Sequence, residues 1–69
     1  MNWTQIQNNW IVFKDRLRTN WAQLTDEDVT RIAGQHDELV ARLQERYGFA
    51  EGEAEREIEA WIKAQRNAA

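Results

Sequence analysis

Apolar residues recur at a helical period along the first third of the chain. At about 100° per residue they fall within an arc of about 80°, which is the pattern of an amphipathic helix. The members of this stripe are Trp3, Ile6, Trp10, Phe13, Leu17, Trp21 and Leu24. The stripe therefore predicts one long helix that ends near Leu24. Its N-cap is Asn2, Asn8 or Asn9, because asparagine is favoured at that position.

A second, shorter helix is predicted to begin after Thr25. The Thr25 hydroxyl can accept a hydrogen bond from a free backbone N–H group, and the three acids that follow lie where the helix dipole favours negative charge. Val29, Ile32 and Ala33 are expected to face inward. Gly34 is predicted to end this helix, since glycine adopts the left-handed conformation at little cost.

Two further helices are predicted over residues 35–47 and 50–65. The run ERYGFAEGEAE between them is interpreted as a helix-helix corner, in which Gly48 reverses the chain and Phe49 packs back. Residues 66–69 are expected to fray. The inward positions of the two helices are His36, Leu39, Val40, Leu43 and Tyr47, and then Ala54, Ile58, Trp61 and Ile62. The pattern as a whole predicts an all-α fold, a small bundle of four helices in a single domain over residues 1–69, with a core at about 9–65.

Composition places the chain in the soluble globular class, with 42% hydrophobic and 30% charged residues and a mean hydropathy of -0.84. It contains no cysteine, which excludes a disulfide and a thiolate nucleophile and fits the reducing cytosol. The start lacks the pattern of a signal peptide, and no stretch approaches the roughly 20 apolar residues of a membrane span. We therefore expect a cytoplasmic protein that does not enter a membrane.

Charge is distributed unevenly along the chain. Residues 1–24 carry +2, from Lys14, Arg16 and Arg18 against Asp15, and residues 25–69 carry -5, which together give the net charge of -3. Phosphate binding depends on clustered cations, and the acidic part repels a polyanion. Weak nucleic-acid binding through Lys14, Arg16 and Arg18 therefore stays as an alternative function.

The residues available for chemistry are few. The chain has no serine and one histidine, His36, and a packed structural imidazole is the commoner role for a lone histidine on an apolar helix face. Asp26, Asp28 and Thr30 match positions 1, 3 and 5 of an EF-hand loop, but Arg31 occupies the position that requires glycine. Helix capping is the preferred interpretation of these acids. We expect no catalytic residue, no metal site and no cofactor, so the chain is not predicted to be an enzyme.

Two sets of apolar residues suggest contacts with other molecules. Four tryptophans could stack on bases, but Trp10 and Trp21 keep register with the apolar stripe, so a core role is preferred. Ile11 and Val12 lie off the stripe and are candidate contacts for a protein partner or for weak self-association. An incidental pair of exposed apolar residues is the alternative.

The stretch from Asn9 to Trp61 resembles the CsbD-like bacterial stress-response family, and in particular its YjbJ-type members. The run QERYG is the most specific of the matching elements. The full set is Asn9-Trp10, Phe13-Lys14, Trp21, Leu24-Thr25-Asp26, Gly34, Asp37, Leu39-Val40, Leu43-Gln44, Arg46-Tyr47-Gly48 and Ala54. The resemblance implies two packed helical hairpins, similar to a SAM domain, and a role in general stress responses. It implies no biochemical activity and no catalytic residue.

Two departures from the family pattern bear on this interpretation. Asp15, Ala22 and Ala41 stand where the family often has glycine, and each exchange is expected to favour helix by up to about 1 kcal/mol. Ile11 and Val12 replace residues that are commonly polar, which favours the contact hypothesis. We therefore expect a non-enzymatic, CsbD-like stress-response protein, a compact helical module that acts through surface contacts, first of all with proteins.

Overall fold

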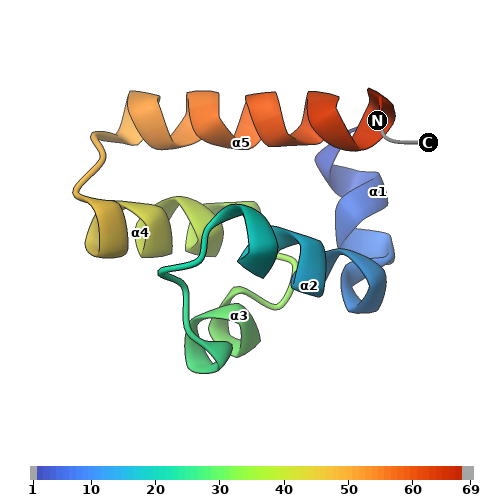
Figure 1. The fold of residues 1–69 in the computed structure, drawn as a ribbon, viewed down its shortest axis with the longest axis horizontal. Helices are drawn as coiled ribbons and strands as arrows, with labels where there is room; N and C mark the ends of the chain where they lie inside the picture. The colour runs from blue at the N-terminus through green and yellow to red at the C-terminus, as the bar shows by residue number, and fades with distance from the viewer. Residues whose placement is uncertain (1, 68–69) are drawn as a thin grey trace.

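The computed structural model describes residues 2–67, with the side chains of residues 2–65. This part of the chain forms five helices, α1 (Trp3–Asn8), α2 (Trp10–Asn20), α3 (Asp26–Ile32), α4 (His36–Tyr47) and α5 (Glu51–Asn67), and contains no strand (Figure 1). The all-α prediction is confirmed. The prediction of four helices is wrong, and the arrangement of two hairpins, similar to a SAM domain, is not confirmed.

The prediction of one long first helix is wrong, because the helix is interrupted at Asn9. The backbone there leaves the helical region (φ -119°, ψ 37°), and the Asn9 side-chain Nδ2 donates to the Gln5 carbonyl at 2.9 Å. The Val12 N–H then bonds to the Asn9 carbonyl at 2.9 Å, which starts α2. The predicted stripe is nevertheless buried in large part, since Trp21 and Leu24 fill the core from the loop after α2.

Helix α1 packs on the corner between α3 and α4. The Trp3 Nε1–H donates to the Gly34 carbonyl at 2.9 Å, and the Trp3 and His36 rings pack edge to face with centroids 5.6 Å apart. Ile6, on the same face, is fully buried. Gly34 has φ 82°, and a Cβ atom there would lie 3.2 Å from Gln7 Cγ. The corner therefore needs glycine both for its conformation and for the approach of α1.

The Gly34→Ala substitution is expected to lower the free energy of unfolding by about 1–2 kcal/mol, because an L side chain is strained at positive φ. Gly52→Ala is the matched control, since Gly52 lies in α5 with open space around it. The control should raise the free energy of unfolding by up to about 1 kcal/mol. Urea titration followed by tryptophan fluorescence measures both changes, and equal effects would contradict the role of this corner.

The ends of α3 are defined by its flanking residues. The Thr25 hydroxyl accepts from the Asp28 N–H and the Asp28 carboxylate accepts from the Thr25 N–H, each at 3.1 Å, so the predicted cap is confirmed. Helix α3 ends at Ile32. Ala33 takes the left-handed conformation ahead of Gly34 and is exposed, so its predicted inward position is wrong.

The predicted corner between α4 and α5 is confirmed. Gly48 ends α4 with φ 73°, and Phe49 stacks on Tyr47 with ring centroids 5.3 Å apart. The Ala50 N–H donates to the Glu53 side chain at 3.1 Å, which caps the start of α5. Helix α5 continues to Asn67, two residues beyond the predicted end of this helix at residue 65. Residues 68–69 lie outside the described residues.

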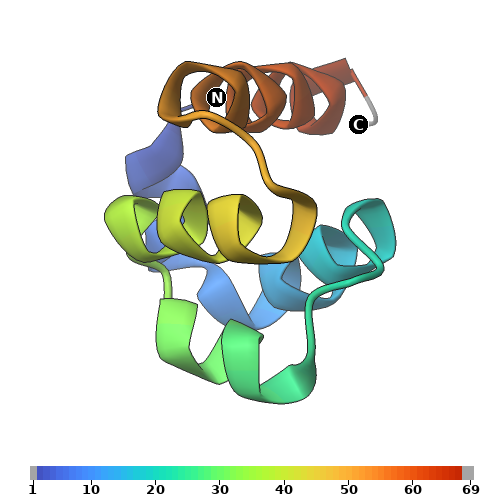
Figure 2. The ribbon, with the colours of Figure 1, turned by 90° about the vertical axis from the view of Figure 1, so that its left-hand side faces the viewer.

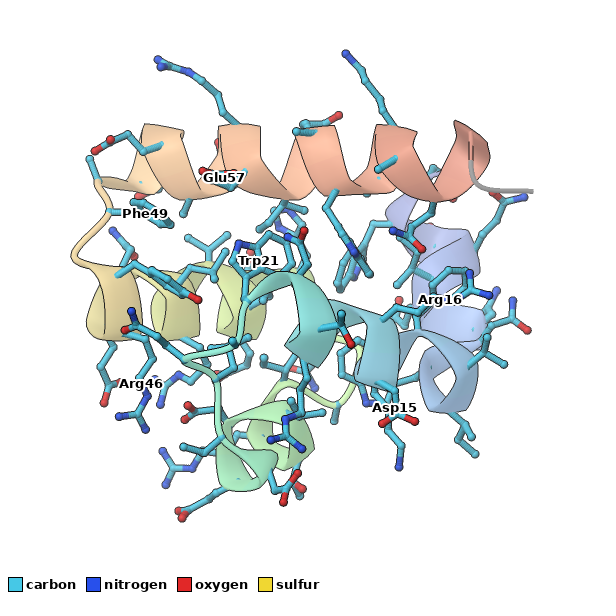
Figure 3. All side chains as sticks on the ribbon, viewed as in Figure 1. Asp15, Arg16, Trp21, Arg46, Phe49 and Glu57 are labelled. Atoms are coloured by element: carbon cyan, nitrogen blue, oxygen red, sulfur yellow. The ribbon has the colours of Figure 1, made fainter. Side chains whose placement is uncertain are left out.

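Helix α4 lies in the middle of the fold, with α5 on one side and α3 on the other (Figures 1 and 2). Phe13, Trp21 and Trp61 form an aromatic cluster that joins α2 and its following loop to α5. Figure 3 shows Trp21 between the end of α2 and α5. The residues of the core are Ile6, Phe13, Leu17, Trp21, Leu24, Val29, Ile32, Leu39, Val40, Leu43, Ala54, Ile58, Trp61 and Ile62. Within the described range, no helix is long and apolar enough to cross a membrane.

Candidate protein-contact surface

Helix α2 presents two aliphatic side chains to solvent. Phe13 and Leu17 are buried, so the helical register turns the neighbouring positions outward. Ile11 is 80% exposed and Val12 is 54% exposed. They are the exposed large hydrophobic residues of the part of the chain that the structure describes. The apolar positions predicted to lie off the stripe are therefore at the surface.

Ile11 also forms one wall of a groove between α2 and α3. Trp10, Val29 and Ala33 contribute further apolar surface to this groove. Its charged lining residues are Lys14, Asp15 and Arg18 from α2 and Asp26 from α3. The arrangement combines an apolar surface with charges of both signs, which is a composition typical of a protein contact rather than of a phosphate site.

The three cations proposed for nucleic-acid binding do not share one face. Arg18 forms an ion pair with Asp26 across the groove. Arg16 extends on the side of α2 nearer α5, where its Nη1 donates to the Gln65 side chain at 3.5 Å, whereas Asp15 points away from α5 (Figure 3). Lys14 lines the groove beside Asp15. The structure thus separates the positive charges and places an acid among them.

The tryptophans are used mainly for packing. Trp21 and Trp61 are buried, and Trp3 and Trp10 are half-buried against the core with their ring centroids 6.4 Å apart. The preferred core role is confirmed for Trp21. Since two of the four rings are buried and the other two pack partly against the core, the tryptophans do not form a row of open faces for bases to stack on.

His36 is half-exposed at the start of α4. Its Nδ1 lies 3.8 Å from an Asp37 carboxylate oxygen, and its ring packs against Trp3. It also lines an open hollow along α5 with Glu55 and Glu59. Among residues 2–67, no group of three or more histidine, cysteine, aspartate or glutamate side chains is placed to hold a metal ion.

An ion pair between α3 and α4, which joins the buried Asp28 to the exposed Arg46, was not predicted from the sequence. The Asp28 carboxylate is only 2% exposed and accepts from Arg46 Nε at 2.7 Å and from Arg46 Nη2 at 3.0 Å. These hydrogen bonds, with help from Thr25 and against the cost of burial, lower the pKa of Asp28 to about 2. The carboxylate in turn raises the pKa of Arg46. The only sequence signal was the threonine cap three residues before the acid.

This pair has a structural role. It uses both oxygens of the carboxylate, and the same carboxylate also accepts the Thr25 N–H, so its hydrogen-bonding capacity is occupied from two elements. A carboxylate held in this way is a poor proton donor or acceptor at neutral pH. The most perturbed acid of the described chain therefore supports the fold.

Comparison with models of known protein families found no match. Individual relatives are similar over nearly the whole chain. The chain is 43% identical over 63 residues to the UPF0337 protein YjbJ of Escherichia coli O6:H1, which covers 91% of each chain. It is 46% identical to a UPF0337 protein of Pectobacterium atrosepticum, over 88% of each chain. It is 38% identical to a UPF0337 protein of Rhodopseudomonas palustris, over 90% of this chain and 94% of the relative.

Each of these matches covers about nine-tenths of the chain or nearly so, at 88–91%. At this identity and coverage, the chain belongs to the UPF0337 family of bacterial proteins.

Proposed function

We propose that this UPF0337 protein is a non-enzymatic, CsbD-like stress-response protein that acts in the cytoplasm by binding other proteins through Ile11 and Val12 of α2. The observation that carries this proposal is the exposure of the two side chains, 80% and 54%, on one turn of a helix whose other face is well packed. The stress-response part rests on the resemblance to the CsbD-like family.

Exposed aliphatic side chains on a small protein favour association. Each buried Å² of apolar surface contributes about 25 cal/mol, so covering Ile11 and Val12 would stabilise a complex, although binding entropy offsets part of this gain. The groove beside Ile11 gives a protein partner a shaped surface to fill. Charged residues around the apolar centre resemble the rim that surrounds protein interfaces.

Weak nucleic-acid binding through Lys14, Arg16 and Arg18 has less support. Arg18 is already paired with Asp26, and Arg16 lies on the other side of α2 from the groove. Titration of single-stranded and duplex DNA at low salt, followed by tryptophan fluorescence, should give no saturable change. Saturable binding that falls steeply with salt and is lost in a Lys14→Ala, Arg16→Ala, Arg18→Ala triple variant would replace the protein-contact proposal.

Site-specific photocrosslinking in stressed cells tests the protein contact. A crosslinking amino acid at position 11 or 12 should capture protein partners, whereas the same group at Ala60, exposed on α5, should not. A strain that lacks the gene should recover stress survival with the wild-type chain but not with the Ile11→Ser, Val12→Ser double variant. The matched control is Ala60→Ser, Ala64→Ser, which also changes two exposed positions. Equal survival with both double variants would overturn the proposal.

A further inference from the structure

The groove between α2 and α3 has an unusual balance of charge for this chain. The protein as a whole carries -3, and α5 alone begins with several glutamates. The groove instead contains two cations, Lys14 and Arg18, and two acids, Asp15 and Asp26. This surface is therefore neutral on an acidic protein, and it surrounds the most exposed large hydrophobic residue of the described chain, Ile11.

Part of that charge is already neutralised within the chain. Arg18 and Asp26 pair with each other across the groove. Within residues 2–65, no salt bridge involves Lys14 or Asp15, so one charge of each sign is left on adjacent positions of α2. A basic partner would meet Lys14 unfavourably, and an acidic partner would meet Asp15 unfavourably. A partner surface that carries one acid and one cation at adjacent positions can pair with both Lys14 and Asp15.

We propose that a second copy of this chain occupies this groove, with the two α2 helices antiparallel about a two-fold axis. In such a contact the same surface serves both copies, so Lys14 of each copy lies against Asp15 of the other. The antiparallel register that pairs positions 14 and 15 also sets Ile11 against the aliphatic stem of Arg18 in the second copy. Because the contact is two-fold, the same residues of α2 form two ion pairs and cover Ile11 in both copies.

The size of the surface predicts a weak dimer. Stable dimers bury about 800 Å² on each partner, and the exposed area of the whole described chain is only 4545 Å². One helix face and the adjoining groove supply a part of what a stable dimer needs. Association is therefore expected to depend on concentration, over about 10 μM to 1 mM. This inference rests on the proposed protein-contact function, because it assigns a partner to the surface that contains Ile11.

Charge exchange at positions 14 and 15 gives the decisive test, by sedimentation equilibrium on the full purified chain. The wild-type mass should rise from 8.2 kDa towards twice that value as concentration increases. Lys14→Asp and Asp15→Lys should each weaken dimerisation about tenfold, because each places like charges opposite each other. An equimolar mixture of the two single variants should recover the dimer, since one then offers two acids and the other two cations. Ile11→Ser should abolish dimerisation, because it removes the apolar side chain that the second copy covers.

The outcomes separate this inference from the proposed function. A strict monomer at about 1 mM, or a dimer that survives Ile11→Ser, overturns the two-fold contact. Two single variants that fail to associate when mixed overturn it as well, provided that circular dichroism shows both to be folded. A monomeric chain whose position 11 still crosslinks to other proteins in stressed cells would leave the proposed function standing. If the purified chain forms the dimer but the Ile11→Ser, Val12→Ser variant restores stress survival as well as the wild type does, the proposed function is overturned and the inference is supported.

Discussion

The Asp28→Asn substitution is expected to lower the free energy of unfolding by about 2 kcal/mol at pH 7. The reason is the Arg46 guanidinium, whose two hydrogen bonds hold the pKa of Asp28 at about 2 instead of its ordinary 3.8. A pKa difference of this size between folded and unfolded chains corresponds to about 2 kcal/mol of stability from the charged form. Asparagine keeps the shape of the side chain but has no charge. Urea titration at pH 7 measures the difference.

Acid should remove this contribution in a defined pH range. The folded-state pKa lies below the unfolded-state value, so the stabilisation is fully present above about pH 4 and is lost as the pH falls towards about 2. The difference in stability between the wild type and Asp28→Asn should therefore shrink over that range. Urea midpoints at pH 7, pH 4 and pH 2.5 measure this change.

Asp26→Asn is the matched control for the position of the acid in the helix. Asp26 lies in the same first turn of α3 and also pairs with an arginine, Arg18, but at an exposed surface. Its substitution should change the free energy of unfolding by less than about 1 kcal/mol. If Asp28→Asn is no more destabilising than Asp26→Asn, or if its effect persists unchanged at pH 2.5, the ion pair of the buried Asp28 with Arg46 does not stabilise the fold.

The boundaries of α3, α4 and α5 follow closely from local sequence chemistry. Thr25 caps α3 through its own side chain, and Gly48 ends α4 by adopting a positive φ. Both effects act within a few residues of the chain, so a sequence pattern contains the information. The aliphatic pair Ile11 and Val12 was predictable in the same way, because helical register alone turns these side chains away from the core. Their role in binding stays a prediction.

The division of the first helix into α1 and α2 depends on contacts far along the chain. The apolar stripe runs through Asn9 without interruption in its helical register, so periodicity gives no sign of a break. What bends the chain is the docking of α1 on the α3–α4 corner, where Trp3 bonds to the carbonyl of Gly34, 31 residues away. Asn8 and Asn9 were predicted as candidate N-caps, but the Asn9 side chain instead donates to the Gln5 carbonyl at the end of α1.

The electrostatic features were the least predictable from sequence. Asp28 and Arg46 are 18 residues apart and share no helix, so no periodic pattern connects them. Helical register places Arg16 on the opposite side of α2 from Lys14 and Arg18, but it does not say which neighbouring element each side of the helix meets. In the structure, Arg18 forms an ion pair with Asp26 of α3, and Arg16 donates a hydrogen bond to Gln65 of α5. Tertiary packing decided which cations stayed available.

Trp61→Ala is expected to leave most molecules unfolded at 25 °C. Trp61 is buried on α5, with its ring centroid 5.5 Å from that of Trp21 and 6.2 Å from that of Phe13. Removing a buried tryptophan side chain costs about 3–5 kcal/mol, through lost apolar burial and the cavity left behind. A single core in a chain of this length rarely supplies more than about 3–5 kcal/mol. The loss therefore equals most of the stability available. Far-UV circular dichroism and thermal melts measure the folded fraction.

Two further variants separate the ring cluster from general effects on α5. Trp61→Phe keeps an aromatic ring and should fold with a lower melting temperature, because the smaller ring fills only part of the site. Lys63→Ala changes an exposed position on the same helix and should alter the free energy of unfolding by no more than about 0.5 kcal/mol. A Trp61→Ala chain that melts within a few degrees of the wild type would mean that α5 is held by its contacts with α4 alone. The aromatic cluster would then be dispensable for the fold.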